Sequence, residues 1–369
     1  MRESGECVYG IYPERGCCGV VTLFQIDYTK WMNRNERSLD MTEKTKIILD
    51  VDTGTDDACA IMMAYLEEKI ELLAVCTVMG NKPIDNTTEN TLRVRDVLGA
   101  DFPVYRGCHR PLVCDLLPNR HAGYGGVRTK VGDMDEEVSM HNEYLDLPPS
   151  TGKVEDMHAV LFYIDTLMKS DGDITIVPVA PLTNIAMAMR IEPDICGKIK
   201  EIVMMGGGRY RANSTAAAEF NIWFDPEAAQ IVMESGVPIR MVPLDATHRA
   251  CINTDETKIF REINNPVSLA IADCVDHRIA AYKQLQPMER VDSAPVHDAL
   301  AVCAVAYPEV LKDVRLHRVD VDISGGFADG QTIVDPRAFT DRPKNVYFAL
   351  DSDREFFANW MIGNAKKVR

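Results

Sequence analysis

The stretch KIILDVDTGTDDACAIMMA, residues 46–64, decides the fold class, because two different periodicities meet inside it. KIILDV is a short continuous apolar run, which favours a buried strand, and residues 56–69 carry the apolar spacing of a helix. Four carboxylates surround the junction: Asp50, Asp52, Asp56 and Asp57. Like charges this close repel one another, so the junction needs a partner that offsets them.

Strand and helix patterns continue to alternate after this stretch. We expect further strands at ELLAVCTVMG, ITIVPVA, IKEIVMMGGG and VPIRMVPLD, with helical patterns between them. Such alternation predicts an α/β fold with a mostly parallel central sheet and helices on both faces, of Rossmann-like type. We expect a single domain over residues 45–369. Residues 1–44 lack a sustained period, and we interpret them as an N-terminal extension that is either dispensable, with translation starting at Met41, or a poorly packed arm.

The bulk composition excludes several classes of partner. The formal net charge is -16, which argues against binding to nucleic acid or to an anionic membrane. No apolar run approaches the roughly 18 residues that span a membrane. The 11 cysteines show no CxxC pairing, which favours a reducing, cytoplasmic setting over a disulfide framework. A small ligand or an acidic metal site fits this balance.

Polar residues follow several of the predicted strands, where ligands bind in α/β sheets. They are the aspartates of the junction, Asn81, Thr183, Met205 with its following glycines, and Asp245. A divalent cation would offset the crowded carboxylates, and oxygen-only ligands favour Ca²⁺ or Mg²⁺ over zinc. Asp52 and Asp57, on either side of a turn at Gly54, would both reach one ion. The alternative is that these aspartates cap the helix, but capping requires one or two of them.

Two further segments carry candidate residues. APVHDALAV places His297 and Asp298 at the start of an apolar helix, and taken alone this segment favours an ordinary cap beside a surface histidine over a functional pair. AEFNIWFDPEAA places Glu219 and Asn221 two residues apart, so in an extended segment they would share one side. A polar side of this kind suits a hydroxyl-rich ligand, and ordinary polarity of an edge strand is the alternative.

Asp50-Val-Asp52-Thr53 also resembles the strand end of haloacid dehalogenase-type phosphatases, which would use Mg²⁺ and Asp50 as the nucleophile. Gly54 stands where those enzymes have Thr or Val. This phosphatase is the runner-up interpretation, and a ribose-binding protein without turnover is the alternative that is not an enzyme.

Seven blocks in order resemble the nucleoside hydrolases, the family of inosine-uridine-preferring nucleoside N-ribohydrolases. They are DVDTGTDDA, MGN, PLTNIA, MMGGG, NSTAAAEFN, DPEAA and VHDALA. The resemblance runs from about residue 46 to the C-terminus. Thr53 stands where the family usually has Pro, and Ala180 where it prefers Gly.

The resemblance implies a role for each matching position. A Ca²⁺ ion would be held by Asp52, Asp57, the backbone carbonyl of Thr183, and Asp298. The ribose hydroxyls would be bound by Asp56, Asn81, Asn213, Glu219 and Asn221, with Met205 packed near the sugar. Asp52 would also deprotonate the attacking water on the ion. His297 would face the base and help to protonate it as it leaves, and Asp50 would support the aspartates from behind.

The implied reaction is hydrolysis of the N-glycosidic bond of ribonucleosides to free base and ribose. Its transition state resembles an oxocarbenium ion, which an acidic pocket stabilises. On the base side, the resemblance suggests His121, within NRHAGYGGV, and Tyr282 near a flap. It also suggests a homodimer or homotetramer. The sequence leaves open the preference for purines or pyrimidines and the role of the acidic segment 128–150.

Overall fold

The computed structural model describes residues 44–117, 120, 140–337 and 341–368. The predicted extension, apart from its last residue, and His121 therefore lie outside the described residues. The chain from Glu43 to Arg369 forms one compact unit. Among the described residues, no helix combines the length and apolar character that crossing a membrane requires.

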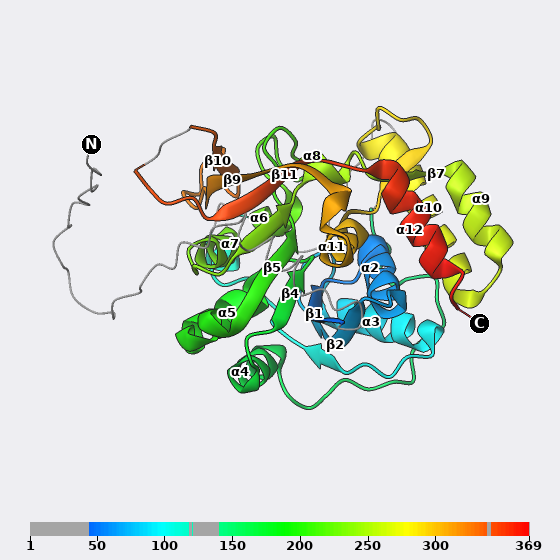
Figure 1. The fold of residues 1–369 in the computed structure, drawn as a ribbon, viewed down its shortest axis with the longest axis horizontal. Helices are drawn as coiled ribbons and strands as arrows, with labels where there is room; N and C mark the ends of the chain where they lie inside the picture. Colours follow the sequence, from blue (N-terminus) through cyan, green and yellow to red (C-terminus); the bar gives the residue numbers. More distant parts are fainter. Residues whose placement is uncertain (1–43, 118–119, 121–139, 338–340, 369) are drawn as a thin grey trace, which may run out of the picture. The chain divides into compact units, whose positions relative to one another are not determined.

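A nine-stranded sheet runs through this unit in the order β10-β9-β11-β6-β5-β4-β1-β2-β3 (Figure 1). Its strands are β1 (Thr45–Val51), β2 (Ile70–Thr77), β3 (Val104–Arg106), β4 (Ile174–Pro178), β5 (Ile199–Met205), β6 (Ile239–Val242), β9 (Leu311–Val321), β10 (Thr332–Asp335) and β11 (Val346–Ser352). Neighbours from β11 to β3 pair in parallel, whereas β9 is antiparallel to both β10 and β11. A separate antiparallel pair joins β7 (Cys251–Asn253) to β8 (Ser293–Pro295). The predicted mostly parallel sheet is confirmed.

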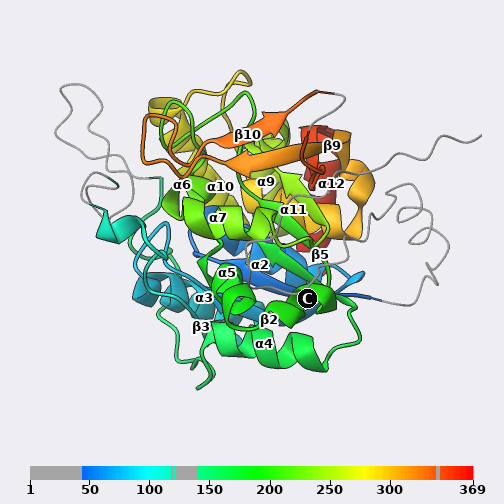
Figure 2. The same cartoon turned by 90° about the vertical axis from the view of Figure 1, so that its left-hand side faces the viewer.

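Helices cover both faces of this sheet (Figures 1 and 2). One face carries α2 (Thr55–Leu66), α3 (Ile84–Leu98), α8 (Leu244–Thr247), α9 (Thr254–Ile263), α10 (Pro266–Leu285), α11 (His297–Ala306) and α12 (Arg354–Ala365). The other carries α4 (Ala159–Lys169), α5 (Thr183–Ile191), α6 (Phe220–Phe224) and α7 (Pro226–Met233). The sequence of β1 is a continuous apolar run because the strand is buried on both faces of the sheet. Ile47 and Leu49 pack into one core, and Ile48 packs into the other.

The strand order reverses at β1. From β1 the chain continues to β2 and β3 on one side, and it later returns to β4, β5 and β6 on the other side. The connections that leave the carboxyl ends of β1 and β4 therefore diverge and open a crevice, which is where α/β sheets bind ligands. The junction of carboxylates that follows β1 lies at this crevice.

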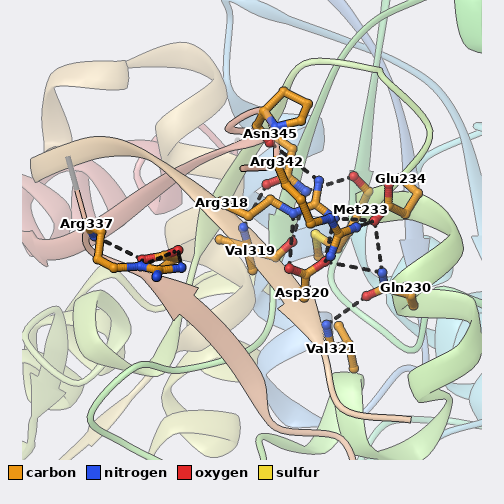
Figure 3. A network of polar contacts seen from close by, with 12 residues as sticks. Gln230, Met233, Glu234, Arg318, Val319, Asp320, Val321, Arg337, Arg342 and Asn345 are labelled. Carbon is orange, nitrogen blue, oxygen red and sulfur yellow. Dashed lines mark hydrogen bonds and ion pairs between the residues drawn. The ribbon is translucent and has the colours of Figure 1, made fainter. Parts of the chain in front are cut away.

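At the end of the sheet formed by β10 and β9, a network of charged side chains joins β9 to α7 (Figure 3). Arg318 and Arg342 both form ion pairs with Glu234 and with Asp320. Gln230 donates to Asp320 (3.4 Å) and Glu234 (3.1 Å). It also accepts from the N–H of Val321, at 2.7 Å. The network fixes the antiparallel edge to the helix layer.

Candidate active site

A cavity of about 350 Å³ lies at the carboxyl ends of the strands. Many of the predicted site residues line it: Asp56, Asn81, Met205, Asn213, Glu219, Asn221, Tyr282, His297 and Asp298. They come from distant parts of the chain, and the sheet brings them together around one cavity. Asp50, Asp52, Asp57 and Thr183 are buried and are not part of this lining.

The start of α2 concentrates negative charge beneath the cavity. Asp57 accepts hydrogen bonds from the N–H groups of Asp52 (3.1 Å) and Gly54 (2.9 Å), so it closes the first turn of the helix. Carboxylate oxygens of Asp56, Asp57 and Asp298 lie within 4.8 Å of one another. Burial and the charge of Asp56 raise the pKa of Asp57 to about 7, and burial with the neighbouring aspartates raises the pKa of Asp298 well above its ordinary value.

Asp52 is fully buried beside this cluster. One of its oxygens, Oδ2, accepts the N–H of Asn81 at 2.5 Å. A side chain at Gly80 would place a Cβ 2.1 Å from that oxygen, so glycine is needed in the MGN block. Burial and the charge of Asp57 raise the pKa of Asp52 well above its ordinary value. The other oxygen, Oδ1, has no hydrogen-bond partner among the described residues.

These observations fit a divalent cation. A buried carboxylate oxygen without a partner is costly, and three further carboxylates nearby repel one another. The donors are all oxygens, which Ca²⁺ and Mg²⁺ prefer. The compact cluster contains Asp56 in addition to the predicted Asp57 and Asp298. The hydroxyl of Thr183 donates to Asp225 at 2.6 Å, which fixes the start of α5. That the backbone carbonyl of Thr183 binds the ion stays a prediction.

The expected extended segment around Glu219 is wrong. Glu219 is the N-cap of α6, and its carboxylate accepts the N–H groups of Asn221 (3.0 Å), Ile222 (3.2 Å) and Gly207 (2.8 Å). A helix begins there because the carboxylate satisfies its unpaired N–H groups. Asn221 donates to the carbonyls of Val179 (3.0 Å) and Met205 (3.2 Å). Both residues still line the cavity.

His297 begins α11, where the sequence placed it, and hydroxyl groups hold both of its ring nitrogens. Nε2 lies 2.7 Å from the hydroxyl of Tyr282, and Nδ1 lies 2.6 Å from Oγ1 of Thr247. Burial, together with the charge of Arg278, lowers the pKa of His297 well below its ordinary value. The imidazole is therefore neutral near pH 7. Thr247 has no distinguishing motif, and the sequence did not indicate it.

Arg278 and His141 are among the residues of the cavity wall that sequence reasoning missed. Arg278 is buried, and its Nη1 lies 2.8 Å from Oδ1 of Asp56 while its Nε donates to the carbonyl of Pro295 at 2.8 Å. His141 belongs to the acidic segment whose role the sequence left open. Its Nδ1 accepts the N–H of Thr55 at 3.3 Å, and burial lowers its pKa to about 3. The glycine at position 54 is the only trace of this contact in the sequence motif. A Cβ there would lie 2.1 Å from Nδ1 of His141, so the ring requires a residue without a side chain.

Asp50 supports the site from behind, which weighs against the phosphatase interpretation. Its Oδ2 accepts hydrogen bonds from the hydroxyl of Tyr163 (2.9 Å) and the amide of Asn184 (3.0 Å). Burial raises its pKa to about 7. A nucleophilic carboxylate must contact its substrate. Asp50 does not line the cavity, and neither do Tyr163 and Asn184, which hold its carboxylate, whereas Asn81, which holds that of Asp52, does.

Comparisons with known proteins agree with this geometry. A family model described as inosine-uridine preferring nucleoside hydrolase matches residues 47–359. The pyrimidine-specific ribonucleoside hydrolase RihB of Escherichia coli (strain SE11) is 38% identical over 317 residues, covering 85% of this chain and 95% of that protein. The chain belongs to the nucleoside hydrolase family, whose members are enzymes of the N-glycosidase type.

Solved structures of nucleoside hydrolases share the fold. A purine-preferring ribonucleoside hydrolase from Gardnerella vaginalis superposes with a TM-score of 0.74 at 32% identity, covering 87% of this chain and 99% of that one. An inosine-guanosine nucleoside hydrolase gives a TM-score of 0.72 at 27% identity, covering 88% and 99%. The names of these relatives place purine and pyrimidine preferences on one scaffold.

Proposed function

We propose that this enzyme hydrolyses ribonucleosides of the inosine and uridine type to free base and ribose, in a reaction that depends on Ca²⁺. The observation that carries the proposal is that the predicted ribose-binding residues line one cavity directly beside the carboxylate cluster. The family membership and the pyrimidine-specific relative support the same reaction.

The proposed ligands of the ion are Asp52, Asp57, Asp298 and the carbonyl of Thr183. When bound, Ca²⁺ would offset the repulsion among these carboxylates and make a coordinated water easier to deprotonate. The unpartnered Oδ1 of Asp52 supports this assignment, because it is a buried acceptor that no described protein group satisfies.

Asp52 is the proposed base. Its Oδ2 is held by the N–H of Asn81, so the carboxylate has a fixed orientation, and its unpartnered Oδ1 is the proposed acceptor of the proton from the attacking water.

The ribose is proposed to lie between α2 and α6. The side chains that would bind its hydroxyls are Asp56, Asn81, Asn213, Glu219 and Asn221. Positive charge grows on the sugar as the N-glycosidic bond breaks, so these acidic and amide groups stabilise the transition state more than the ground state. Arg278 holds the carboxylate of Asp56 in place at 2.8 Å.

The leaving base is proposed to face His297 and Tyr282. The contact of 2.7 Å between their polar atoms gives a path for a proton toward the base. Neutral His297 donates a hydrogen bond toward the departing base through one nitrogen while Thr247 holds the other, and the proton that Asp52 takes from water balances the proton that the base gains. This pairing is the proposed general acid.

The setting and the assembly remain proposals of the same kind. The described cysteines are free, and several are buried, which supports a reducing, cytoplasmic setting. We expect a homodimer or homotetramer, and sedimentation equilibrium of the purified chain measures the number of copies.

The test is release of reducing sugar from inosine and from uridine, with Ca²⁺ present and then after chelation. We expect release from at least one nucleoside, its loss on chelation and its recovery on adding Ca²⁺ back. The ratio of the two rates gives the base preference. Release that continues unchanged in the chelator would contradict the metal-dependent mechanism, and no release from either nucleoside would contradict the proposed substrates.

A further inference from the structure

A second cavity, of about 240 Å³, adjoins the nucleoside cavity. Its lining includes Arg211, His248, Arg249, Glu289, Arg290 and Arg354. Gln286 lines both cavities, and the ring of His248 lies 5.6 Å from that of His297. The sequence analysis indicated none of these residues, and the proposed hydrolysis does not use this cavity.

The charge of this second cavity is opposite to that of the first. Four arginines face it, against one carboxylate, that of Glu289. Glu289 lies 3.0 Å from Nη2 of Arg211 and 3.7 Å from Nη1 of Arg249. Arg354 is paired with Glu256. Within the described part of the chain, Arg290 forms no ion pair, so the cavity retains uncompensated positive charge.

A buried nitrogen in the wall also lacks a partner. The side chain of His248 is 7% exposed, and its Nε2 has no hydrogen-bond partner among the described residues. The Nε of Arg354 is likewise buried without one. Buried polar atoms are normally satisfied, and the Nε–H of Arg354 is a donor, so an unpartnered donor in a residue that lines the cavity favours a ligand that accepts hydrogen bonds.

We propose that this cavity binds a phosphate group. Guanidinium groups bind phosphate and carboxylate oxygens through the same N–H donors. In this cavity the carboxylate of Glu289 already pairs with Arg211 and Arg249. Glu289 is 74% exposed in its side chain, and exposed ion pairs of this kind are weak. A phosphate dianion offers more charge and more acceptor oxygens than Glu289, so it displaces this carboxylate from Arg211 and Arg249.

The displacement has a consequence for the nucleoside cavity. Gln286 donates to the carbonyl of Ala212 at 3.3 Å, and Glu289 pairs with Arg211, so two contacts hold residues 286–289 against residues 211–213. Gln286, Ala212 and Asn213 line the nucleoside cavity. Phosphate removes one of the two contacts and therefore changes the KM for the nucleoside.

The test is calorimetric titration of the metal-loaded enzyme with inorganic phosphate at constant ionic strength. The variant Arg249→Gln/Arg290→Gln removes two exposed cations of the cavity and should weaken phosphate binding by about 10-fold or more. Arg261→Gln is the matched control, because this arginine lies on α9 and pairs with Asp273 and Asp276. Its affinity for phosphate should equal that of the parent enzyme. No saturable binding by the parent, or equal binding by the double variant, overturns the proposal.

A second variant tests the competition directly. Glu289→Gln removes the carboxylate that occupies the arginines, so it should bind phosphate several-fold more tightly than the parent. Weaker binding would show that Glu289 belongs to a different arrangement and would overturn the proposal. Because these titrations measure binding without turnover, they remain informative even if the proposed hydrolysis fails.

The source of the phosphate group is distinguished by the titrant. Inorganic phosphate, uridine and uridine 5′-monophosphate are compared on the parent and on Arg249→Gln/Arg290→Gln, after chelation of the metal so that neither uridine compound is hydrolysed. A loss in the double variant that is larger for the nucleotide than for the free ion indicates a nucleotide ligand. An equal loss for both indicates free phosphate. A loss for uridine alone overturns the proposal, because the cavity would then act only through the nucleoside site.

Discussion

Two clusters of charged side chains, one at the end of β1 and one between β9 and α7, differ in how their carboxylates are compensated. At the end of β1, burial and neighbouring carboxylates raise the pKa of Asp57 to about 7, and an oxygen of Asp52 has no partner among the described residues. At β9, burial opposes the charge of Asp320, but Arg318 offsets it and holds the pKa of Asp320 below its ordinary value. The edge cluster is complete within the chain.

The contrast separates structural charge from functional charge. Arg318 and Arg342 supply the edge with as many cations as it has carboxylates, so the network of Figure 3 needs nothing from solution. At the cavity, Arg278 pairs with Asp56 alone among the clustered aspartates. For the remaining carboxylates, the proposed compensation comes from a bound cation and from the positive charge that develops on the ribose. An excess of buried charge thus marks the active site.

The largest effect is expected from the centre of the uncompensated cluster. Asp52→Asn keeps the shape of the side chain but removes the proposed base, so kcat for nucleoside hydrolysis should fall by about 1,000-fold or more. Steady-state kinetics measure the loss, and circular dichroism shows whether the fold is intact. A folded variant with near-parental kcat would refute the role of Asp52.

A smaller loss is expected on the base side of the cavity. His297→Ala removes the proposed general acid and should lower kcat by about 100-fold with an ordinary leaving base. A substrate with an activated leaving group, such as a nitrophenyl riboside, needs no protonation and should lose much less. Equal losses on both substrates would show that His297 acts by positioning the sugar.

The stability of the metal-free enzyme should fall as the pH rises. Asp57 and Glu219 have folded pKa values of about 7, against ordinary values of 3.8 and 4.5, and burial is the main cause. The folded state therefore holds more protons than the unfolded state between about pH 4 and pH 7, so stability is lost across that interval as the pH increases. Ca²⁺ binds the ionised carboxylates and should reverse the loss, most clearly above pH 7.

Thermal unfolding at pH 5 and pH 8, with chelator and with Ca²⁺, measures this dependence. We expect a lower midpoint at pH 8 than at pH 5 in chelator, and a larger gain from Ca²⁺ at pH 8. A metal-free enzyme that is more stable at pH 8 would show that the aspartate cluster is compensated by the protein itself.

The smallest effect is expected at the edge. Glu234→Gln removes one carboxylate from the paired network and should destabilise the fold by about 1 kcal/mol while leaving kcat and KM unchanged. Urea unfolding and steady-state kinetics measure the two quantities. Asp173→Asn is the control, because its ion pair with Lys46 is exposed and should leave the urea midpoint where it was. A kinetic defect in Glu234→Gln would couple the edge to the site.

Much of the site was predictable because its residues stand in local motifs. The aspartates after β1, Asn81 after β2, and the pair His297–Asp298 follow apolar runs whose type the pattern reveals. Other residues stand in no motif. Arg278 and Thr247 lie within helices, and the pattern cannot tell which of their neighbours they face. The sequence analysis assigned Glu219 to an extended segment. The helix that Glu219 caps has five residues, and so short a helix shows little periodicity in its sequence.

The sequence by itself determined the class of fold, the family, and the crowding of carboxylates at the end of the first strand. These depend on local order: strand, turn and helix follow one another within about twenty residues. Tertiary structure alone decided that the strand order reverses at β1, that Arg278 pairs with Asp56, and that His141 closes over Gly54. It also decided that an arginine-lined cavity adjoins the acidic one. Such contacts join residues far apart in the chain, and they exist only after the helices pack onto the sheet.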